Sequence, residues 1–451
     1  MPVDLNKPID LTKPEWQAAF TQLQANIFKG HGHDYIALIP MTLEATDRVR
    51  SCFGEFASRR VTSASEQMAR SWTDKDPLEE SAEARPVMGG VYVSIWGYLK
   101  LGYCPRRLEL AFPHPRDEEN TNWFLEGMQQ VGRYILDPPK VSQQPEYRDA
   151  NIDAMLLIAA DNESDLQDEV NSALAEMQGW ARPIAVEKGR VLRRDGYVIE
   201  PFGYRDGISR PNHFKKDSPE YQPPGKIIVP DLLAGNPDAY GSYLVYRKLE
   251  QNVKAFHEAE TAIATELGLP EEDRERAGAM IVGRFRDGTP LTLHPTAGNP
   301  TNDFSHDGDQ GLRCPMHAHI RKVRPRTEGN YRDRMVRRGI PYGPYDPTTS
   351  SAPPETGTGL LFMSFQADLQ HQFGQAIARW VNDVHFEAKY TGQDPLLGHG
   401  SIPVKQEQNW PKVWNQDDSS RFQCGASPKL VTFKGGEFLF APSLAWFHSL
   451  A

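Results

Sequence analysis

The order of apolar segments along the chain repeats, and this repeat limits the possible folds more than any other feature. In the first half, residues 34–41 form an apolar run of strand length, and residues 44–58 follow with helical spacing. Residues 90–98 alternate as a strand does, residues 153–161 form another apolar run, and residues 163–180 place apolar side chains on one helical face. The first half therefore consists of two strand–helix–strand units in succession, with an insertion between the two units.

The second half has a similar order. Residues 241–249 are typical of a strand, and residues 253–267 of a helix that Gly268 ends. Residues 357–368 form a strong strand pattern that a helix follows, and residues 430–440 indicate a hairpin with its turn at two adjacent glycines. This order favours two α+β halves with antiparallel sheets over one parallel sheet.

A long connection separates the two halves. Residues 210–238 are rich in Pro, Gly, Asn and Lys, which is typical of a loop. A chain of 451 residues is long enough for two or three domains, or for two fused halves of one architecture. We therefore predict an N-terminal half over residues 1–225 and a C-terminal half over residues 226–451.

Charge and cysteine usage narrow the class of partner. Asp and Glu number 60 against 50 Lys and Arg, and the resulting charge of -10 repels phosphate backbones, so no nucleic-acid partner is expected. The chain has no apolar run of membrane-spanning length, and its first residues lack the features of a signal peptide. The four cysteines are widely spread and form no CxxC pair. We expect a cytoplasmic protein that does not enter a membrane.

The first segment that could carry chemistry is FGYRDGIS, at residues 202–209. Glycines flank Asp206, so its carboxylate can lie on a tight turn close to a ligand. Two other Arg-Asp-Gly triplets occur, at residues 194–196 and 286–288. The residues alone do not choose among the three carboxylates, and each is also consistent with a plain solvated turn.

The second segment is CPMHAHIRK, at residues 314–322. His317 and His319 are two positions apart, so they cannot share one helical face and grip a metal together. One of them is suited to be the single axial ligand of a haem. The local sequence does not say which.

The third segment is RMVRRGIPYG, at residues 334–343. A basic run of this kind is usually a solvated face. However, Arg337 follows two apolar residues and precedes a rigid Gly-Ile-Pro-Tyr-Gly turn, which is a way to fix one guanidinium in a pocket. Arg338 is the local alternative.

Taken in this order, the three segments resemble the dye-decolourising peroxidase family of haem enzymes. The resemblance extends to LQANIFKG, with Ala25 where Gly is usual, and to GSYLVYRKLEQNV, VGRFRDGTPL and TFKGGEFLFAPSL. It covers most of the chain, whose length resembles the longer subgroup of the family. The implied fold is a pair of ferredoxin-like α+β halves with peripheral helices. One haem b per chain is implied, in a pocket of the C-terminal half near the junction.

The resemblance also implies roles for single residues. The family's Gly-x-x-Asp-Gly motif matches residues 203–207, which implies Asp206 as the distal acid–base residue. Its Ala-His-Ile-Arg segment implies His319 as the ligand of the haem iron, with Arg321 among the cofactor-binding residues. The spacing to the Tyr of the Pro-Tyr-Gly turn implies Arg337 as the distal arginine.

The chemistry of these residue types agrees with the implied roles. A neutral imidazole binds haem iron and leaves the opposite face open. A carboxylate such as Asp206 can take a proton from one oxygen of hydrogen peroxide and return it to the other. Arg337 supplies a fixed positive charge where the leaving hydroxide develops. The implied function is a haem peroxidase that oxidises bulky aromatic, phenolic or dye substrates in one-electron steps. The alternative is a haem-handling protein for storage, delivery or iron release.

Two supporting roles follow from the same resemblance. Asp368 resembles the family's acidic residue that accepts a hydrogen bond from the iron-ligating His, with Asp383 as a rival and a helix N-cap as the ordinary alternative. Tyr342 is the candidate for a surface residue that passes electrons from donors too large for the haem pocket. The oligomeric state and the physiological donor stay open.

Overall fold

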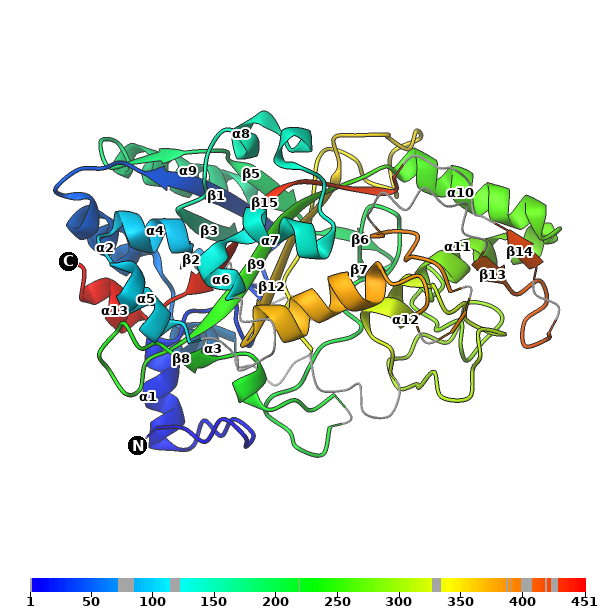
Figure 1. Cartoon of the computed structure of the whole chain (residues 1–451), viewed down its shortest axis with the longest axis horizontal. Coiled ribbons are helices and arrows are strands. Elements are labelled where there is room, and N and C mark those ends of the chain that lie inside the picture. Colours follow the sequence, from blue (N-terminus) through cyan, green and yellow to red (C-terminus); the bar gives the residue numbers. More distant parts are fainter. Residues whose placement is uncertain are drawn as a thin grey trace.

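A computed structural model describes residues 2–71, 85–113, 122–218, 220–326, 334–386, 388–389, 391–398, 408–417, 420–422 and 429–451. Within these residues, eleven strands from both halves of the chain join in one antiparallel sheet (Figure 1). Both ends of the chain lie on the same side of the molecule, away from the helices α10 (Val253–Glu266) and α11 (Arg274–Val282).

The N-terminal half has the strand order of a ferredoxin-like unit. Its strands are β1 (Tyr35–Leu43), β2 (Met88–Val93), β3 (Ala154–Ala160), β4 (Ala181–Pro183) and β5 (Glu187–Arg190). In space β3 lies between β1 and β2, and β1 pairs on its other side with β4 and β5. Helix α2 (Val49–Arg60) links β1 to β2, and α9 (Glu163–Glu176) links β3 to β4.

The C-terminal half repeats this order. Its strands are β9 (Tyr240–Gln251), β11 (Ile340–Tyr342), β12 (Gly359–Gln366) and β15 (Val431–Ala441), and β10 (Val336–Arg337) pairs with the far end of β12. In space β12 lies between β9 and β11, and β9 pairs on its other side with β15. Helix α10 follows β9, and the π-helix η4 (Leu369–Val381) follows β12. The prediction of an α+β fold with two antiparallel, ferredoxin-like halves is confirmed.

The two halves meet edge to edge at two short junctions. Tyr342 of β11 pairs with Gly189 of β5, and Phe440 of β15 pairs with Val93 of β2. Since β9 also pairs with β12, the strands follow a closed path through both halves. Closure leaves few free strand edges, which protects a large sheet from pairing with other chains. The division at residues 225 and 226 stays a prediction.

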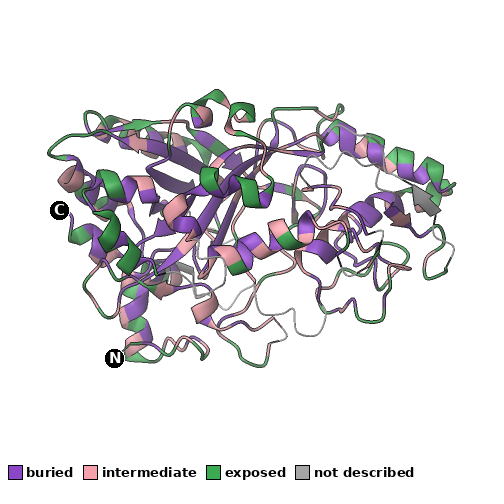
Figure 2. Cartoon of the chain, in the orientation of Figure 1, coloured by how far each residue is buried: buried purple, intermediate pink, exposed green. Residues whose placement is uncertain are grey.

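Apolar side chains cover both faces of this sheet. Along β1, Ile39 and Met41 belong to one buried cluster, whereas Ile36 and Leu38 belong to another. Because successive side chains of a strand point to opposite faces, β1 lies between two cores. This explains why its sequence is a continuous apolar run rather than an alternating one. Figure 2 shows the strands buried and the outward turns of the helices exposed.

The prediction of a hairpin at residues 430–440 is wrong, because these residues lie in one strand, β15. Its register against β9 shifts between Phe433 and Gly435, which marks a β-bulge. A Cβ atom on Gly435 would lie 2.2 Å from the ring of Tyr147, and one on Gly436 would lie 2.1 Å from the carbonyl oxygen of Tyr246. The two glycines therefore allow close packing across the sheet and do not form a turn.

The other elements are mostly short, and all but β8 (Val229–Pro230), which pairs with β9 as the eleventh strand of the sheet, lie around the sheet. They are α1 (Pro14–Gln22), α3 (Ala64–Ser71), α4 (Ile95–Lys100), α5 (Pro105–Ala111), α6 (Trp123–Glu126), α7 (Met128–Ile135), η1 (Lys140–Ser142), α8 (Pro145–Arg148), β6 (Leu192–Arg194), β7 (Tyr197–Ile199), η2 (Pro224–Lys226), β8 (Val229–Pro230), η3 (Glu271–Asp273), α12 (His319–Val323), β13 (Gln408–Trp410), β14 (Ser420–Phe422) and α13 (Leu444–His448). Among the described residues, no helix is both long enough and apolar enough to cross a membrane.

Candidate active site

His319 is the first residue of α12, and a buried carboxylate fixes its ring. Nδ1 of His319 lies 2.7 Å from Oδ2 of Asp394, and because a carboxylate accepts, the imidazole donates from Nδ1. The side chain of His319 is 20% exposed, whereas that of Asp394 is fully buried. Nε2 of His319 has no hydrogen-bond partner among the described residues, so it is free to bind a ligand.

Asp394 is itself held in place by main-chain donors. Its Oδ1 accepts from the amides of Leu396 at 2.8 Å and Leu397 at 3.2 Å. Burial alone would raise the pKa of Asp394, but His319 and these two amides hold that pKa below its ordinary value. The carboxylate therefore stays charged beside the ring and fixes the proton on Nδ1.

The prediction that Asp368 supports His319 is wrong. Asp368 is the N-cap of η4, where its Oδ1 accepts from the amides of Gln370 and His371, each at 2.9 Å. Its Oδ2 lies 2.8 Å from Nδ1 of His371. An aspartate before an apolar helix is favoured as a cap, and that local preference decides its position. Asp394 lies in a loop, and its sequence neighbourhood carries no signal for this role.

His317 has a different environment from His319. It is only 1% exposed, and its ring centroid lies 4.3 Å from that of the fully buried Trp410. Its Nε2 is buried and has no hydrogen-bond partner among the described residues. His317 is therefore a core residue, and the structure supports His319 as the ligand.

The side chain of Glu200 fixes the backbone of the loop that carries Asp206. Oε2 of Glu200 accepts from the amide of Phe202 at 3.0 Å and from Nε2 of Gln251 at 2.7 Å, while its Oε1 accepts from the amide of Tyr204 at 2.9 Å. Burial raises the pKa of this carboxyl to about 6, with a smaller contribution from Asp206. Glu200 was not predicted from the sequence.

Asp206 projects from this loop and is exposed. Its Oδ1 accepts from the amide of Gly207 at 2.6 Å, and its own amide donates to the carbonyl of Val198 at 2.9 Å. Gly203 and Gly207 have φ values of 91° and 78°, a region that disfavours side chains. The glycines of the motif are therefore required by the backbone that presents the carboxylate.

The other two Arg-Asp-Gly triplets form ordinary turns. Asp195, with φ of 50°, lies at the turn between β6 and β7. The carboxylate of Asp287 accepts from the amide and hydroxyl of Thr289 and from the amide of Gly298. Asp287 is thus used inside its own loop, which leaves Asp206 as the better candidate for proton transfer.

Arg337 and Arg338 also differ in their surroundings. Arg338 donates to the main-chain carbonyls of Asn26 at 2.8 Å, Ile27 at 3.0 Å and Phe28 at 2.9 Å, so it fastens the N-terminal segment to the sheet. Arg337 is exposed, and its guanidinium forms no hydrogen bond or ion pair with any described residue. Its positive charge acts on the nearby Arg284.

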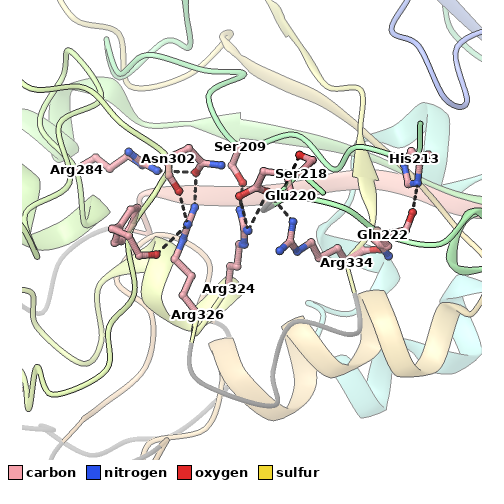
Figure 3. A network of polar contacts seen from close by, with 11 residues as sticks. Ser209, His213, Ser218, Glu220, Gln222, Arg284, Asn302, Arg324, Arg326 and Arg334 are labelled. Carbon is pink, nitrogen blue, oxygen red and sulfur yellow. Dashed lines mark hydrogen bonds and ion pairs between the residues drawn. The ribbon is translucent and has the colours of Figure 1, made fainter. Parts of the chain in front are cut away.

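Four arginines form a cluster between these segments (Figure 3). Arg324 and Arg334 both point toward Glu220, with nitrogen to oxygen distances of 3.0 Å and 2.6 Å. Arg284 and Arg326 bond to Asn302 and to main-chain carbonyls, and neither forms an ion pair among the described residues. Burial and the neighbouring arginines lower the pKa of Arg284 to about 10 and that of Arg326 to about 9.

Contacts around this arginine cluster bring the three predicted segments together. Arg324, five residues after His319, donates to the hydroxyl of Ser209, three residues after Asp206. Arg284 lies close enough to Arg337 and Arg324 to be affected by both charges. The loop that follows α11 packs at Gly283 against Ile320 and at Gly288 against Ile208. It therefore bridges the helix of His319 and the loop of Asp206.

Two other residues with predicted roles, Arg321 and Tyr342, are buried. The guanidinium of Arg321 is 3% exposed and donates to the carbonyl of Cys314 at 2.8 Å and to Oδ2 of Asp309 at 3.2 Å, which fixes the loop before His319. Its role as a cofactor-binding residue stays a prediction. Tyr342 was predicted to lie at the surface, and this prediction is wrong, because β11 lies at the junction of the two halves. Tyr342 is 8% exposed, and its hydroxyl is buried.

Comparison with known proteins finds similarity over the whole chain. Residues 200–387 match the family model for the C-terminal part of Dyp-type peroxidases. The chain is 34% identical to the multifunctional dye peroxidase DyP2 of Amycolatopsis sp., over 100% of both chains. The solved structure of DyP2 from Amycolatopsis superposes with a TM-score of 0.87 at 31% identity, covering 99% of this chain and 100% of that one. A DyP-type peroxidase from Anabaena gives 0.86 at 32% identity and covers 99% of each chain.

These two halves and this whole-length similarity define a peroxidase. The chain belongs to the dye-decolourising peroxidase family, as its sequence predicted. It is an oxidoreductase that acts on hydrogen peroxide, and membership of the family implies a haem cofactor.

Proposed function

We propose that this chain holds one haem b on His319 and uses hydrogen peroxide to oxidise bulky aromatic, phenolic or dye substrates in one-electron steps. The observation that carries the proposal is the pairing of His319 with Asp394. One ring nitrogen is fixed by a buried carboxylate, and the other has no hydrogen-bond partner among the described residues. This is the arrangement expected of an imidazole that binds a metal.

The residues present fit a haem. Nε2 of His319 has no partner in the described part of the chain, and its side chain is partly exposed, so this nitrogen can bind the iron. The arginine cluster, with Glu220 as the carboxylate that pairs with two of its four members, suits the two propionate groups of a haem. When bound, the haem iron supplies the redox chemistry that amino-acid side chains lack.

The chain's own residues then divide the work on peroxide. Asp206 takes the proton from one peroxide oxygen and returns it to the other, because its carboxylate is exposed and held on a rigid loop. Arg337 cannot lose its proton, so it offers a constant positive charge to the departing oxygen. Asp394 keeps the proton of His319 on Nδ1, which leaves Nε2 as the metal-binding nitrogen.

The haem-handling alternative is less supported. A carrier needs His319 and Asp394 but has no use for Asp206 and Arg337, which the arginine cluster links to the same site. A relative that matches the whole chain is named a peroxidase. The cytoplasmic location stays a prediction.

The ligand assignment can be tested with two histidine variants of the haem-loaded protein. His319→Ala should lose haem or change the spin state in the Soret spectrum. His317→Ala removes a neighbouring imidazole that is buried in the core. This variant should keep both the haem and the wild-type spin state. The opposite pair of spectra would show that His317 is the ligand.

The activity is tested by steady-state oxidation of guaiacol with hydrogen peroxide. We expect peroxide-dependent turnover from the wild-type protein and a large loss in Asp206→Asn. A protein that binds haem stoichiometrically but oxidises no donor would support haem handling instead.

A further inference from the structure

A cavity lies beside the loop that carries Asp206, and Arg205 of that loop lines it. Its volume is about 500 Å³, within the range of roughly 300–1,000 Å³ that holds small organic molecules. Its walls come from the β6–β7 hairpin, from Arg205, from α10 and α11, and from the loop after α11. Asp206, His319 and Arg337 are not among the described residues that line it.

An arginine and a tyrosine form one wall of this cavity. The guanidinium carbon of Arg205 lies 3.7 Å from the ring centroid of Tyr197, which is 40% exposed. Arg205 has no hydrogen bond or ion pair through its side chain to any described residue. A guanidinium stacked on an aromatic ring keeps its N–H edge free for an oxyanion. The wall therefore offers an unpaired positive charge beside an exposed ring.

The carboxylates of the cavity are mostly engaged. Both carboxylate oxygens of Glu260 accept from the guanidinium of Arg286, at 2.6 Å and 2.7 Å. Its Oε1 also accepts from the hydroxyl of Tyr204 at 3.2 Å. Glu275 accepts from the amide of Arg286 at 3.0 Å. Asp287 is used within its own turn, as described above. Asp195 is exposed at the tip of the hairpin, where water screens its charge.

We propose that this cavity, called here the Arg205 cavity, binds an aromatic anion, namely a flat ring system that carries a sulfonate or carboxylate. The anionic group meets the guanidinium of Arg205, and the ring lies against the exposed part of Tyr197 and the apolar lining of Ile199 and Ala264. Ring stacking and a charge-assisted hydrogen bond together favour such a ligand over a neutral or cationic one.

The cavity also lies next to the catalytic loop. Arg205 precedes Asp206, and its amide donates to the carbonyl of Arg286 at 2.9 Å. A molecule in the cavity is therefore held against the same loop that presents Asp206, although it does not enter the haem pocket. The structure thus assigns the cavity as a place where an anionic electron donor is held. That role rests on the proposed peroxidase function, whereas binding itself does not.

Binding is tested with naphthalenesulfonate as the probe and calorimetry as the readout, without peroxide. Arg205→Gln should weaken binding by about 10-fold, the loss of one charge-assisted hydrogen bond. Arg193→Gln is the matched control, because Arg193 lies on the same hairpin, is paired with Asp34 at 2.6 Å and does not line the cavity. This control should change binding less than twofold, and Arg205→Lys should restore part of the loss.

Three results would overturn the proposal. Equal weakening in Arg205→Gln and Arg193→Gln would show a general surface effect. Unchanged binding in Arg205→Gln would place the probe elsewhere. Equally tight binding of naphthylmethylammonium would show that the cavity does not prefer anions.

Turnover separates the binding site from the proposed function. In Arg205→Gln, the KM for a sulfonated anthraquinone dye should rise about 10-fold relative to the KM for guaiacol, whereas Arg193→Gln should keep the wild-type ratio. If the wild-type protein oxidises neither donor, the peroxidase proposal fails while the calorimetry still decides the cavity. If binding depends on Arg205 but the ratio of KM values does not change, the cavity is not a donor site.

Discussion

The carboxylate of Asp394 accepts a hydrogen bond from Nδ1 of His319 at 2.7 Å, although the two residues are 75 positions apart. A charged carboxylate in this position makes the imidazole a more electron-rich ligand. We expect Asp394→Asn to slow the peroxide-induced change of the Soret band by about 10- to 100-fold. Rapid-mixing spectroscopy measures this rate.

Asp368→Asn is the control for this prediction, because Asp368 caps η4 and pairs with His371 instead. It should leave both the rate, within about twofold, and the thermal midpoint close to the wild-type values, because Asn caps a helix about as well as Asp. If the Soret change were slow in Asp368→Asn and normal in Asp394→Asn, Asp368 and not Asp394 would be the residue that supports His319.

Asp206 should control the proton transfer of the peroxide step. Asp206→Asn keeps the size of the side chain but cannot act as a base, so the rate of the peroxide step should fall by about 10²–10⁴-fold with haem content unchanged. Asp195→Asn, at the tip of the β6–β7 turn, should have no such effect. A wild-type rate in Asp206→Asn would move the proton transfer to another group.

Substitution of Arg337 should affect activity, whereas substitution of the adjacent Arg338 should affect stability. Arg337→Gln removes a charge with no partner among the described residues, so we expect a loss of about 10²–10³-fold in the peroxide step and an unchanged melting temperature. Arg338→Gln removes hydrogen bonds to three main-chain carbonyls and should destabilise the fold by about 2–4 kcal/mol. Denaturant unfolding and stopped-flow rates on both variants check this, and a swap of the two effects would contradict it.

Glu437 should make stability fall as the pH rises through neutrality. Burial raises the pKa of its carboxyl from 4.5 to about 7, although the amides of Met128 and Phe438 and the indole of Trp96 favour the charged form. The folded protein therefore binds more protons than the unfolded chain between these two values. The stabilisation is complete below about pH 4.5 and is lost as the pH rises through about 7.

Glu437→Gln cannot ionise, so its free energy of unfolding should depend less on pH between about 4.5 and 7. Urea unfolding at several pH values measures the slope for both proteins. Equal slopes would show that Glu437 does not carry the dependence.

Much of the fold and of the three motif segments could be predicted from the sequence, because the relevant forces act over a few residues. The helix at α10 was predicted as residues 253–267 and is found at Val253–Glu266, where apolar spacing and a following glycine set its length. The glycines around Asp206 likewise allow a local backbone with positive φ, wherever the loop lies in the molecule. These features do not depend on distant neighbours.

Only the tertiary structure decided which distant groups meet. Asp368 was expected beside His319 because its segment resembles the family's, yet Asp368 caps η4, and packing places Asp394 beside His319 instead. Tyr342 follows a tight turn like a surface residue, yet pairing between β11 and β5 buries it at the junction of the two halves. Such outcomes depend on contacts between segments far apart in the chain, and local propensity carries no information about those contacts.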